Sequence, residues 1–243
     1  FYRSAKKVWN LWSEELQHFA PKDNAGKWAS PFDINVCRKD SWNDPYFYEG
    51  VSRSWTYNVQ ADFAGLVARC GGEVGFEQHL DRYFEDKKII AKETFMHIPY
   101  LYHYANRPDK SSKIVRRILS KAYKPERFGI PDNEDMGCHS AFYICGLLGI
   151  YPMMGQDWYF LVAPAFERSV IRLGQSGAEL IIEAQNPSDK NVHIESATLD
   201  GARLDRAWIR HEEIKHGAVL SFSLSSSETD WGRHKPPPSP LSS

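Results

Sequence analysis

The hydrophobic period of this chain changes at Tyr151-Pro152, and this change limits the possible folds more than any other feature. Before it, apolar residues recur every three or four positions, as they do on the buried face of a helix. After it, short apolar runs at 159–162, 169–173, 179–184, 192–199 and 219–224 are separated by Gly, Asn and Pro, which is typical of strands. Helices followed by strands predict the α+β fold class.

This pattern also predicts the domain organisation. We expect residues 1–157 to form a helical domain and residues 158–232 a small antiparallel β region. Residues 233–243 contain Pro236-Pro237-Pro238 and few core-forming residues, so we expect a disordered tail. Residues 20–55 lack a sustained period, and loops of that length inside compact domains are usually functional or disordered. Their many aromatic residues argue against disorder.

The sequence also predicts where several helices and one hairpin begin and end. The spacing of apolar residues predicts a first helix over 2–16 and a buried aromatic helix over 98–105. A helix with Phe63 and Leu66 should end at Gly71-Gly72, and Ser111-Ser112 should cap the helix that follows. Asp200-Gly201 predicts a hairpin turn between two short strands.

The charge balance narrows the class of partner. The 243-residue chain has a formal net charge of −1, with acidic and basic residues interspersed. It gives no reason to expect nucleic acid or an anionic membrane surface as a partner, and no window approaches the roughly 18 apolar residues of a membrane span. The aromatic content is 14%, with eight Trp and twelve Tyr. Sugar-binding clefts use such rings as flat apolar platforms, although protein cores use them too.

Three acidic segments lie among aromatic residues. The densest is Asp132-Asn133-Glu134-Asp135, which precedes an apolar helical run, and the other two contain Glu49 and Glu93. A single segment of this kind is a hard-cation site, a carboxylate for acid–base work or a solvated turn. The turn is favoured for one segment alone, because Asp, Asn, Gly and Pro dominate turns. Three such segments among Trp and Tyr favour a carbohydrate-processing site.

Glycoside hydrolysis would use these acids in two different ways. It needs one carboxylic acid to protonate the leaving oxygen and a second carboxylate to activate water or attack the sugar. Glu49 ends an aromatic loop, a setting that favours a protonated acid, whereas Asp135 lies among acids at a helix entrance and suits an ionised base or a cation ligand. The alternative for Glu49 is an ordinary loop or helix-capping acid.

Glu93 and Asp135 together would suit calcium, which takes six to eight oxygen ligands. The spacing is not that of an EF-hand loop. The alternative is that Glu93 pairs with a nearby base such as Lys92 or Arg107. His97 lies in an apolar run and is more often a hydrogen-bonded core histidine than a ligand.

Taken together, the segments resemble family 92 of the glycoside hydrolases, the calcium-dependent exo-acting α-mannosidases. The similarity extends from residue 1 to about residue 232, and its blocks follow the order of the family. Asp44-Pro45-Tyr46-Phe47-Tyr48-Glu49-Gly50 resembles the segment with the general acid, and Gly129-Ile130-Pro131-Asp132-Asn133-Glu134-Asp135-Met136-Gly137 resembles the block with the catalytic base. Further similar blocks are Asp62-Phe63-Ala64-Gly65-Leu66, residues 97–105, Leu148-Gly149-Ile150-Tyr151-Pro152 and Trp231-Gly232.

The resemblance implies a role for each candidate residue. Glu49 would be the general acid and Asp135 the general base acting on water. Glu93, His97 and Asn133 would bind the terminal mannose, and Glu93 and Asp135 would bind Ca²⁺. Family members invert the anomeric centre, which requires roughly 6.5–9.5 Å between the two catalytic carboxyl groups.

The resemblance also implies a fold and a setting. Residues 1–157 would be the C-terminal part of an (α/α)6 helical toroid, the catalytic domain. An N-terminal β-sandwich and the other half of the barrel, from the same polypeptide, would complete it. The mannose-containing glycan would be met in a secreted or extracytoplasmic location.

The chain departs from the family at some of these positions. Lys92-Glu93-Thr94 stands where the family usually has Asn-Glu-Pro, so a base replaces an amide beside the expected cation. Gln60-Ala61-Asp62 replaces Pro-His-Asp. Such changes bear on linkage specificity and calcium affinity.

The sequence therefore predicts the C-terminal portion of an inverting, calcium-assisted exo-α-mannosidase with a preference for α-1,2-linked mannose. Two hypotheses from other classes stay open. One is a truncated, catalytically inactive remnant of such an enzyme. The other is a mannoside-binding module, which the aromatic content alone would support.

Overall fold

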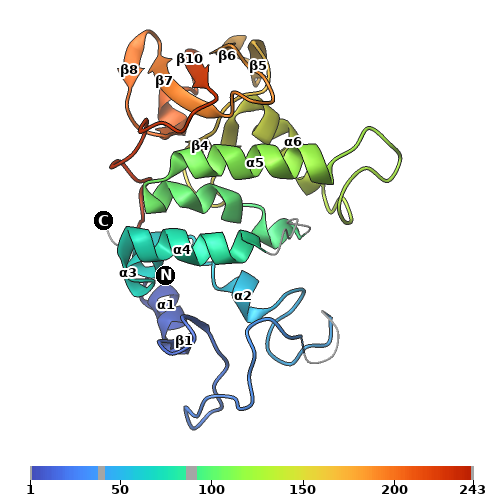
Figure 1. Ribbon diagram of the computed structural model, residues 1–243, viewed down its shortest axis with the longest axis vertical. Coiled ribbons are helices and arrows are strands. Elements are labelled where there is room, and N and C mark those ends of the chain that lie inside the picture. Colours follow the sequence, from blue (N-terminus) through green and yellow to red (C-terminus); the bar gives the residue numbers. More distant parts are fainter. Residues whose placement is uncertain (1, 38–41, 86–91, 242–243) are drawn as a thin grey trace. The chain divides into compact units, whose positions relative to one another are not determined.

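The computed structural model describes residues 2–37, 42–85 and 92–241 of the chain (Figure 1). These residues form two compact units, Phe1–Lys88 with Pro238–Ser243 and Ile89–Pro237. The boundary that we expected after residue 157 therefore lies inside the second unit. The mixed helix and sheet content agrees with the α+β prediction.

The first unit begins with a shorter helical segment than the sequence predicts. The α-helix α1 (Tyr2–Ala5) continues as the 3₁₀-helix η1 (Lys6–Leu11), and the chain then extends into β1 (Trp12–Ser13). β1 pairs with β2 (His18–Phe19) in antiparallel register, and the Trp12 and Phe19 rings pack edge to face with centroids 5.9 Å apart. This pairing ends the helix before residue 16, although the apolar period continues.

Three helices complete the first unit: α2 (Ser52–Trp55), α3 (Phe63–Arg69) and α4 (Gly72–Glu85). The Asp62 side chain caps α3 by accepting a hydrogen bond from the Gly65 N–H at 3.0 Å. The predicted stop after α3 is confirmed, because Gly71 and Gly72 take φ angles of 90° and 84°. α4 buries the predicted face of Phe76, Leu80, Tyr83 and Phe84.

The helices of the second unit are η2 (Glu93–Phe95), η3 (Ile98–Ala105), α5 (Pro108–Ala122) and α6 (Cys138–Leu148). η3 is the predicted aromatic helix, wound as a 3₁₀-helix with every residue buried. α5 lies between η3 and the sheet strand β7 (Figure 1). α6 is confirmed directly after the acidic segment.

The expected start of α5 at Ser111-Ser112 is corrected by the structure. The helix begins at Pro108, which suits a first helical position because proline has no N–H to leave unpaired. Both serines are buried within the helical segment, and their side chains form hydrogen bonds with residues outside the helix. Ser111 Oγ lies 3.0 Å from His103 Nδ1, and Ser112 Oγ accepts a hydrogen bond from the Ala163 N–H at 3.0 Å.

The predicted strands are confirmed to within about a residue at their ends, and they form two larger sheets. One has the order β5-β6-β10-β7-β8 and the other the order β3-β4-β9. The bounds are β3 Ile150–Pro152, β4 Trp158–Leu161, β5 Arg168–Leu173, β6 Ala178–Gln185, β7 His193–Leu199, β8 Ala202–Leu204, β9 Trp208–Arg210 and β10 Ala218–Ser225; a 3₁₀-turn, η4 (His211–Glu213), follows β9.

The pairing of β10 corrects the expectation of a purely antiparallel region. β10 lies between β6 and β7, antiparallel to β7 but parallel to β6. The Asp200-Gly201 hairpin is confirmed: Leu199 faces Ala202, and the two turn residues have φ angles of 50° and 78°.

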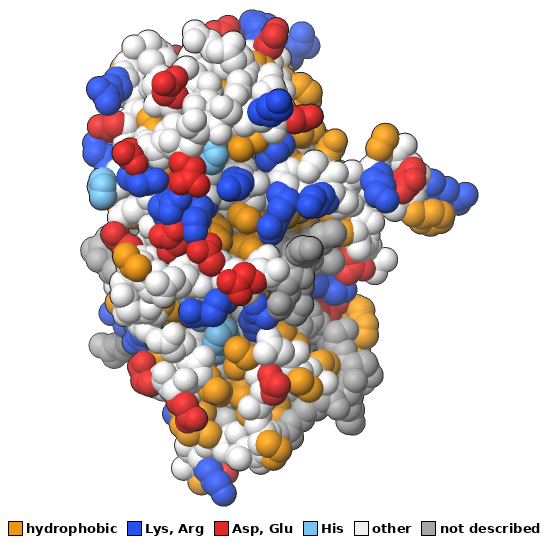
Figure 2. Space-filling view, in the orientation of Figure 1, with side chains coloured by type: hydrophobic (Ala, Val, Ile, Leu, Met, Phe, Trp, Pro, Cys, Tyr) orange, Lys and Arg blue, Asp and Glu red, His pale blue; other side chains and the backbone are white. Residues whose placement is uncertain are grey.

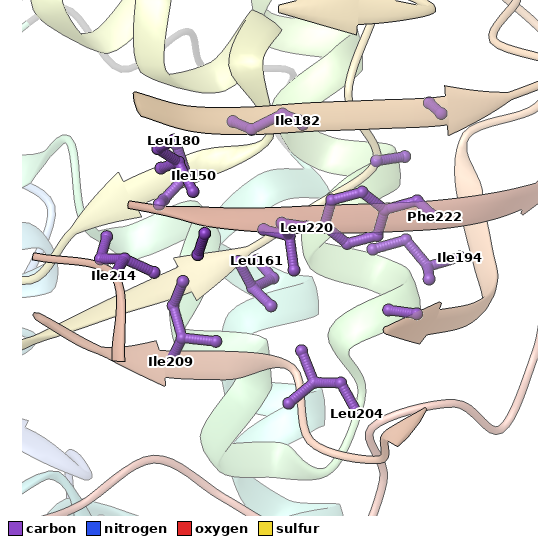
Figure 3. Close-up of a cluster of buried hydrophobic side chains, with 14 of the residues drawn as sticks. Ile150, Leu161, Leu180, Ile182, Ile194, Leu204, Ile209, Ile214, Leu220 and Phe222 are labelled. Carbon is purple, nitrogen blue, oxygen red and sulfur yellow. The ribbon is translucent and has the colours of Figure 1, made fainter. Parts of the chain in front are cut away.

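The core of the second unit is built on this strand order. Leu220 and Phe222 of β10 point into a cluster with Leu180 and Ile182 of β6 and Ile194 of β7 (Figure 3). Residues of β10 alternate between buried and half-buried, as the period of a strand with one buried face requires. Side chains from β3, β4 and β9 close the cluster from the other sheet, among them Ile150, Leu161 and Ile209 (Figure 3).

Residues 233–241, which we expected to be a disordered tail, make specific contacts. Within the second unit, Trp208 Nε1 donates to the Lys235 carbonyl at 3.0 Å and Lys235 Nζ lies 2.6 Å from Asp205 Oδ2. Within the first unit, Ser239 Oγ accepts from the Ala64 N–H at 3.1 Å. Polar contacts of backbone and side chains therefore hold a segment that contributes little apolar surface of its own.

The loop after α5 stands out from the second unit (Figure 1) and carries basic, acidic and hydrophobic side chains on its surface (Figure 2). Phe128 is 83% exposed there. Across the described segments of the chain, no helix combines the length and the apolar character that a membrane crossing requires.

Candidate active site

The Glu49 loop is held by side chains on both sides of the acid. Asp44 Oδ1 accepts hydrogen bonds from the Tyr46 and Phe47 N–H groups, both at 2.9 Å, which tightens the turn that leads to Glu49. Trp55 Nε1 donates to the Tyr48 carbonyl at 2.8 Å. Glu49 is half-buried and takes a φ of 52°, a left-handed conformation that non-glycine residues adopt mainly where the surroundings impose it.

Aromatic rings surround this loop, as the sequence suggests. The Trp42 and Tyr48 rings meet edge to face with centroids 5.5 Å apart, and they are 56% and 54% exposed. On the inner side, Phe32 packs against Tyr46 and Phe47. Rings that stay this exposed in a folded unit are available to a ligand with an apolar face.

The acidic segment forms a strained entrance to α6. Asp135, Met136 and Gly137 have consecutive positive φ angles of 37°, 60° and 83°. The Cys138 N–H then bonds to the carbonyls of Glu134 and Asp135, at 3.1 and 3.3 Å. Two non-glycine residues in the left-handed region carry a conformational cost that the surrounding structure must offset.

Glu134 stabilises the start of the helix. Its Oε1 accepts a hydrogen bond from the Ser140 N–H at 3.0 Å, in the first turn of α6, where N–H groups have no partner within the helix. The neighbouring Asp135 is exposed. Glu134 therefore has a structural role at the start of α6, and the catalytic role of Asp135 stays a prediction.

Glu93 and Asp135 lie around the same thiol. Burial raises the pKa of Cys138, and the negative charges of Glu93, Glu134 and Asp135 raise it further. η2, which carries Glu93, is thus brought to the acidic segment, although 39 or more residues separate them in the chain. The structure thus brings together the segments that carry Glu93 and Asp135, and the role of these two residues as calcium ligands stays a prediction.

An ion pair joins the same two segments. Lys92 Nζ lies 2.8 Å from Asp132 Oδ2, and this contact holds the pKa of the Asp132 carboxyl below its usual value. The Asn133 N–H also donates to Asp132 Oδ1 at 2.9 Å. Sequence reasoning singled out Lys92 but not its partner, because no local spacing links a residue before η2 with the acidic segment.

The remaining candidates have different settings. His97 is 0% exposed at the N-cap of η3, the position of a core histidine. Asn133 is exposed on the acidic segment. Arg107, a suggested partner of Glu93, pairs with Asp109 at 2.6 Å and Glu228 at 3.3 Å. Glu49 belongs to the first unit, whereas Glu93, His97, Asn133 and Asp135 belong to the second.

A further contact, between His139 and Tyr123, lies at the start of the helix that follows the acidic segment. His139, fully buried at the start of α6, lies with its Nδ1 3.0 Å from the Tyr123 hydroxyl. Its charge contributes to the low pKa of Asp132. This pair was missed, since Tyr123 follows α5 and only the packing of α5 on α6 brings it near His139.

The donors near Cys138 are hard oxygens. In the stretches of chain with described coordinates, no three His, Cys, Asp or Glu side chains form a metal-ligand group. The Glu93 and Asp135 carboxylates are nevertheless of the type that calcium takes, with backbone, water and substrate oxygens as its usual further ligands. The donor chemistry therefore fits calcium with only a partial protein cage.

Comparison with known proteins gives a consistent picture. The family model of the glycosyl hydrolase family 92 catalytic domain matches residues 1–226. An uncharacterized secreted glycosidase of Arthroderma benhamiae is 33% identical over 224 residues, which are 88% of this chain and 29% of that protein.

Solved structures show the same similarity. The family GH92 α-mannosidase BT3965 of Bacteroides thetaiotaomicron matches with a TM-score of 0.87 and 25% identity, over 99% of this chain and 33% of that one. The inverting mannosidase BT2199 of the same species matches with a TM-score of 0.86 and 26% identity, over 100% of this chain and 36% of that one. The chain thus spans about a third of the length of the proteins that it matches.

Proposed function

This chain belongs to glycosyl hydrolase family 92, and we propose that it supplies the catalytic acid and base of an exo-acting α-mannosidase. Its substrate would be a terminal α-linked mannose of a glycan, with a preference for α-1,2 linkages. Two solved relatives described as α-mannosidase and inverting mannosidase support this substrate class, as does a complex of BT3965 with mannoimidazole. The secreted relative supports an extracytoplasmic location.

The observation that carries the proposal is the meeting of η2 with the acidic segment. Lys92, the residue before Glu93, pairs with Asp132 at 2.8 Å, and the charges of Glu93 and Asp135 both raise the pKa of Cys138, so acids far apart in sequence lie on segments that meet. A stability role alone would not gather like charges, since their repulsion costs free energy. A bound cation or polyhydroxylated ligand would offset this repulsion, so a binding site explains why the acids lie near one another.

The proposed mechanism assigns one proton transfer to each carboxylate. Glu49 gives its proton to the glycosidic oxygen as the bond to the anomeric carbon breaks. Asp135 takes a proton from the water that attacks the opposite face of the sugar, so the product has the inverted configuration. Glu93 and Asn133 would position the terminal mannose, whereas the burial of His97 fits a core histidine and not a sugar contact. Calcium, held by Glu93 and Asp135, would orient sugar hydroxyls and stabilise developing charge.

The backbone at both catalytic positions fits these roles. Glu49 and Asp135 each lie three residues before a helix and each has a positive φ. Such strained positions cluster at functional sites, where the surroundings fix a side chain in one direction. We take this shared geometry as support for the pairing of the two residues as acid and base.

Proton NMR of α-1,2-mannobiose tests the proposal directly. We expect mannose to be released with calcium and not with a chelator, with the β-anomer appearing first. Glu49→Gln and Asp135→Asn should each lower kcat by at least about 10²-fold, as loss of a positioned acid or base does. The matched controls Glu126→Gln and Asp230→Asn replace exposed acids and should keep activity within twofold.

The outcomes separate the three hypotheses. Mannose release that both active-site variants leave intact would sink the assignment of roles. Binding of mannobiose without release, under either condition, would support a mannoside-binding module. Absence of both would favour an inactive remnant or a chain that needs the rest of its polypeptide for activity.

A further inference from the structure

A hollow of about 320 Å³ lies in the first unit beside Trp28. It is built on a short hairpin in which Lys22 and Trp28 face each other across an antiparallel bridge. Asp23 closes the hairpin: its N–H donates to the Lys27 carbonyl at 3.0 Å, and its Oδ1 accepts from the Lys27 N–H at 2.9 Å. The hollow is therefore formed by ordered backbone and not by a loose loop tip.

Two aromatic rings line the hollow and are held in place. Lys22 Nζ lies 3.8 Å from the centroid of the Trp28 ring and also donates to the Asn10 carbonyl at 2.8 Å. Tyr46 packs edge to face on Phe32, with centroids 6.3 Å apart. Trp28 and Tyr46 are still 38% and 41% exposed. Rings fixed in this way offer flat apolar surface to a ligand at little entropic cost.

Charged and polar groups surround these rings. Lys27, Asp23 and Ser30 also line the hollow. A purely apolar partner would strip water from Lys27 and Asp23 without replacing its hydrogen bonds. A simple anion would meet the Asp23 carboxylate. A neutral polyol with one apolar face satisfies both kinds of surface, which is the chemistry of a hexose.

The hollow lies close to Glu49 along the chain. Tyr46 precedes Glu49 by three residues, so their Cα atoms are at most about 11 Å apart even for an extended chain. A second hollow, of about 500 Å³, shares Trp28, Ala29 and Ser30 with the first. Trp28 therefore lines two neighbouring hollows.

We propose that the hollow at Trp28 and Tyr46 is a carbohydrate subsite that binds inner hexose residues of a mannoside whose terminal residue lies at Glu49. This inference rests on the proposed function for the identity of the sugar. It adds that the chain distinguishes an oligosaccharide from a single terminal mannose. Trp28 is the main determinant, since it lines both hollows.

Calorimetry on a Glu49→Gln background tests the subsite, because the ligand is not consumed if Glu49 is the acid. The probes are α-1,2-mannotriose and methyl α-mannoside. We expect Trp28→Ala to weaken mannotriose binding about tenfold and methyl α-mannoside binding less than twofold. Trp28→Phe keeps a flat ring and should retain mannotriose binding within about threefold. The control Phe128→Ala removes an aromatic ring that is more exposed than Trp28 but lies in the second unit, and should leave both affinities unchanged.

The outcomes distinguish this inference from the proposed function. Mannotriose affinity that is unchanged in Trp28→Ala, or no binding of mannotriose to the parent chain, would overturn the subsite. Mannobiose hydrolysis by the unsubstituted chain is measured separately. Loss of mannotriose binding in Trp28→Ala together with no hydrolysis would uphold the subsite and reject the hydrolase. A near-ultraviolet circular dichroism spectrum and a thermal melt of each variant establish that the first unit is folded.

Discussion

Lys92 Nζ and Asp132 Oδ2 are 2.8 Å apart, and this ion pair joins η2 to the acidic segment that carries Asp135. The two side chains are 25% and 28% exposed, so the pair is neither fully buried nor freely solvated. It lies beside Glu93 and Asn133 in the chain, and it places a fixed positive charge where the family usually has an amide. Its first role is to hold two loops of the candidate site together.

Lys92→Met should raise the pKa of Asp132, because the hydrogen bond from Lys92 is the main cause of its low value. Carbon NMR titration of the carboxyl measures this. A lowered folded-state pKa adds stability above the unfolded pKa, and that stability is lost as the pH falls through the folded pKa. We therefore expect a loss of about 0.2–1 kcal/mol at pH 7 that disappears in acid. Lys215→Met breaks the comparable Lys215–Glu212 pair and should leave Asp132 unchanged.

Acidification should destabilise both units through buried neutral histidines. Burial lowers the pKa of His79 to about 3 and of His103 to about 4. The unfolded chain takes up these protons below about pH 6.5, while the folded chain does not, so stability falls between pH 6.5 and the folded pKa. From pH 7.5 to 5 each histidine should cost on the order of 2 kcal/mol. Urea unfolding at the two pH values measures it; an equal pH slope in His79→Gln would contradict the assignment to His79.

Asp109→Ala should strongly destabilise the second unit. The Asp109 side chain is 1% exposed and pairs with Arg107 at 2.6 Å and Arg233 at 3.6 Å. Removal of the buried carboxylate takes away the partner that two half-buried guanidinium groups share, at a cost of about 1–3 kcal/mol. Chemical unfolding measures the loss. Asp230→Ala also removes a partner of Arg233, but one that is 88% exposed, and should cost under about 0.5 kcal/mol.

Phe222→Ala should cost about 3–5 kcal/mol, since the ring is 2% exposed in the centre of the β cluster and a cavity would remain. Thermal unfolding followed by calorimetry gives the value. Val170→Ala is the comparison on the edge strand β5, where the side chain is 41% exposed. Its effect should stay below about 1 kcal/mol. Similar losses for both would mean that the cluster does not determine the stability of this unit.

Alanine substitutions at Gly149 and Gly155 can distinguish two contributions to the loss of stability, the strain of a left-handed backbone and the clash of a new Cβ with a neighbouring atom. Their φ angles are 79° and 71°, so an alanine at either should cost about 1–2 kcal/mol. A Cβ on Gly149 would also lie 2.6 Å from the Val162 carbonyl oxygen, whereas one on Gly155 would meet nothing within 4 Å. Gly149→Ala should therefore be the more destabilising by denaturant unfolding. Equal effects would show that the contact at Gly149 relaxes freely.

Much of the local structure could be predicted from the residues. The Gly71-Gly72 stop, the buried face of α4, the Asp200-Gly201 hairpin and the long strands agree with the structure. These features depend on period and turn chemistry, which act over a few residues. The prediction of the first helix was wrong because it relied on the period alone. The apolar period continues to Leu16, but the strand pairing of Trp12 with Phe19 replaces the last predicted turn of the helix.

The candidate site was predicted as a set of residues and not as an arrangement. Family-like blocks in the sequence point to Glu49, Glu93 and Asp135. They did not indicate that Asp132 takes Lys92 as its partner or that Glu134 caps α6. Both contacts depend on how η2 and α6 meet, which no spacing within either segment contains.

The sequence by itself determined the fold class and the family, because hydrophobic period, turn residues and ordered motifs are properties of short stretches. Only the tertiary structure decided that β10 enters between β6 and β7, that η2 meets the acidic segment through Lys92 and Asp132, and that residues 233–241 are held by polar contacts. These are pairings between distant segments. Their free energy comes from burial and hydrogen bonding that exist only once the partner segment is in place.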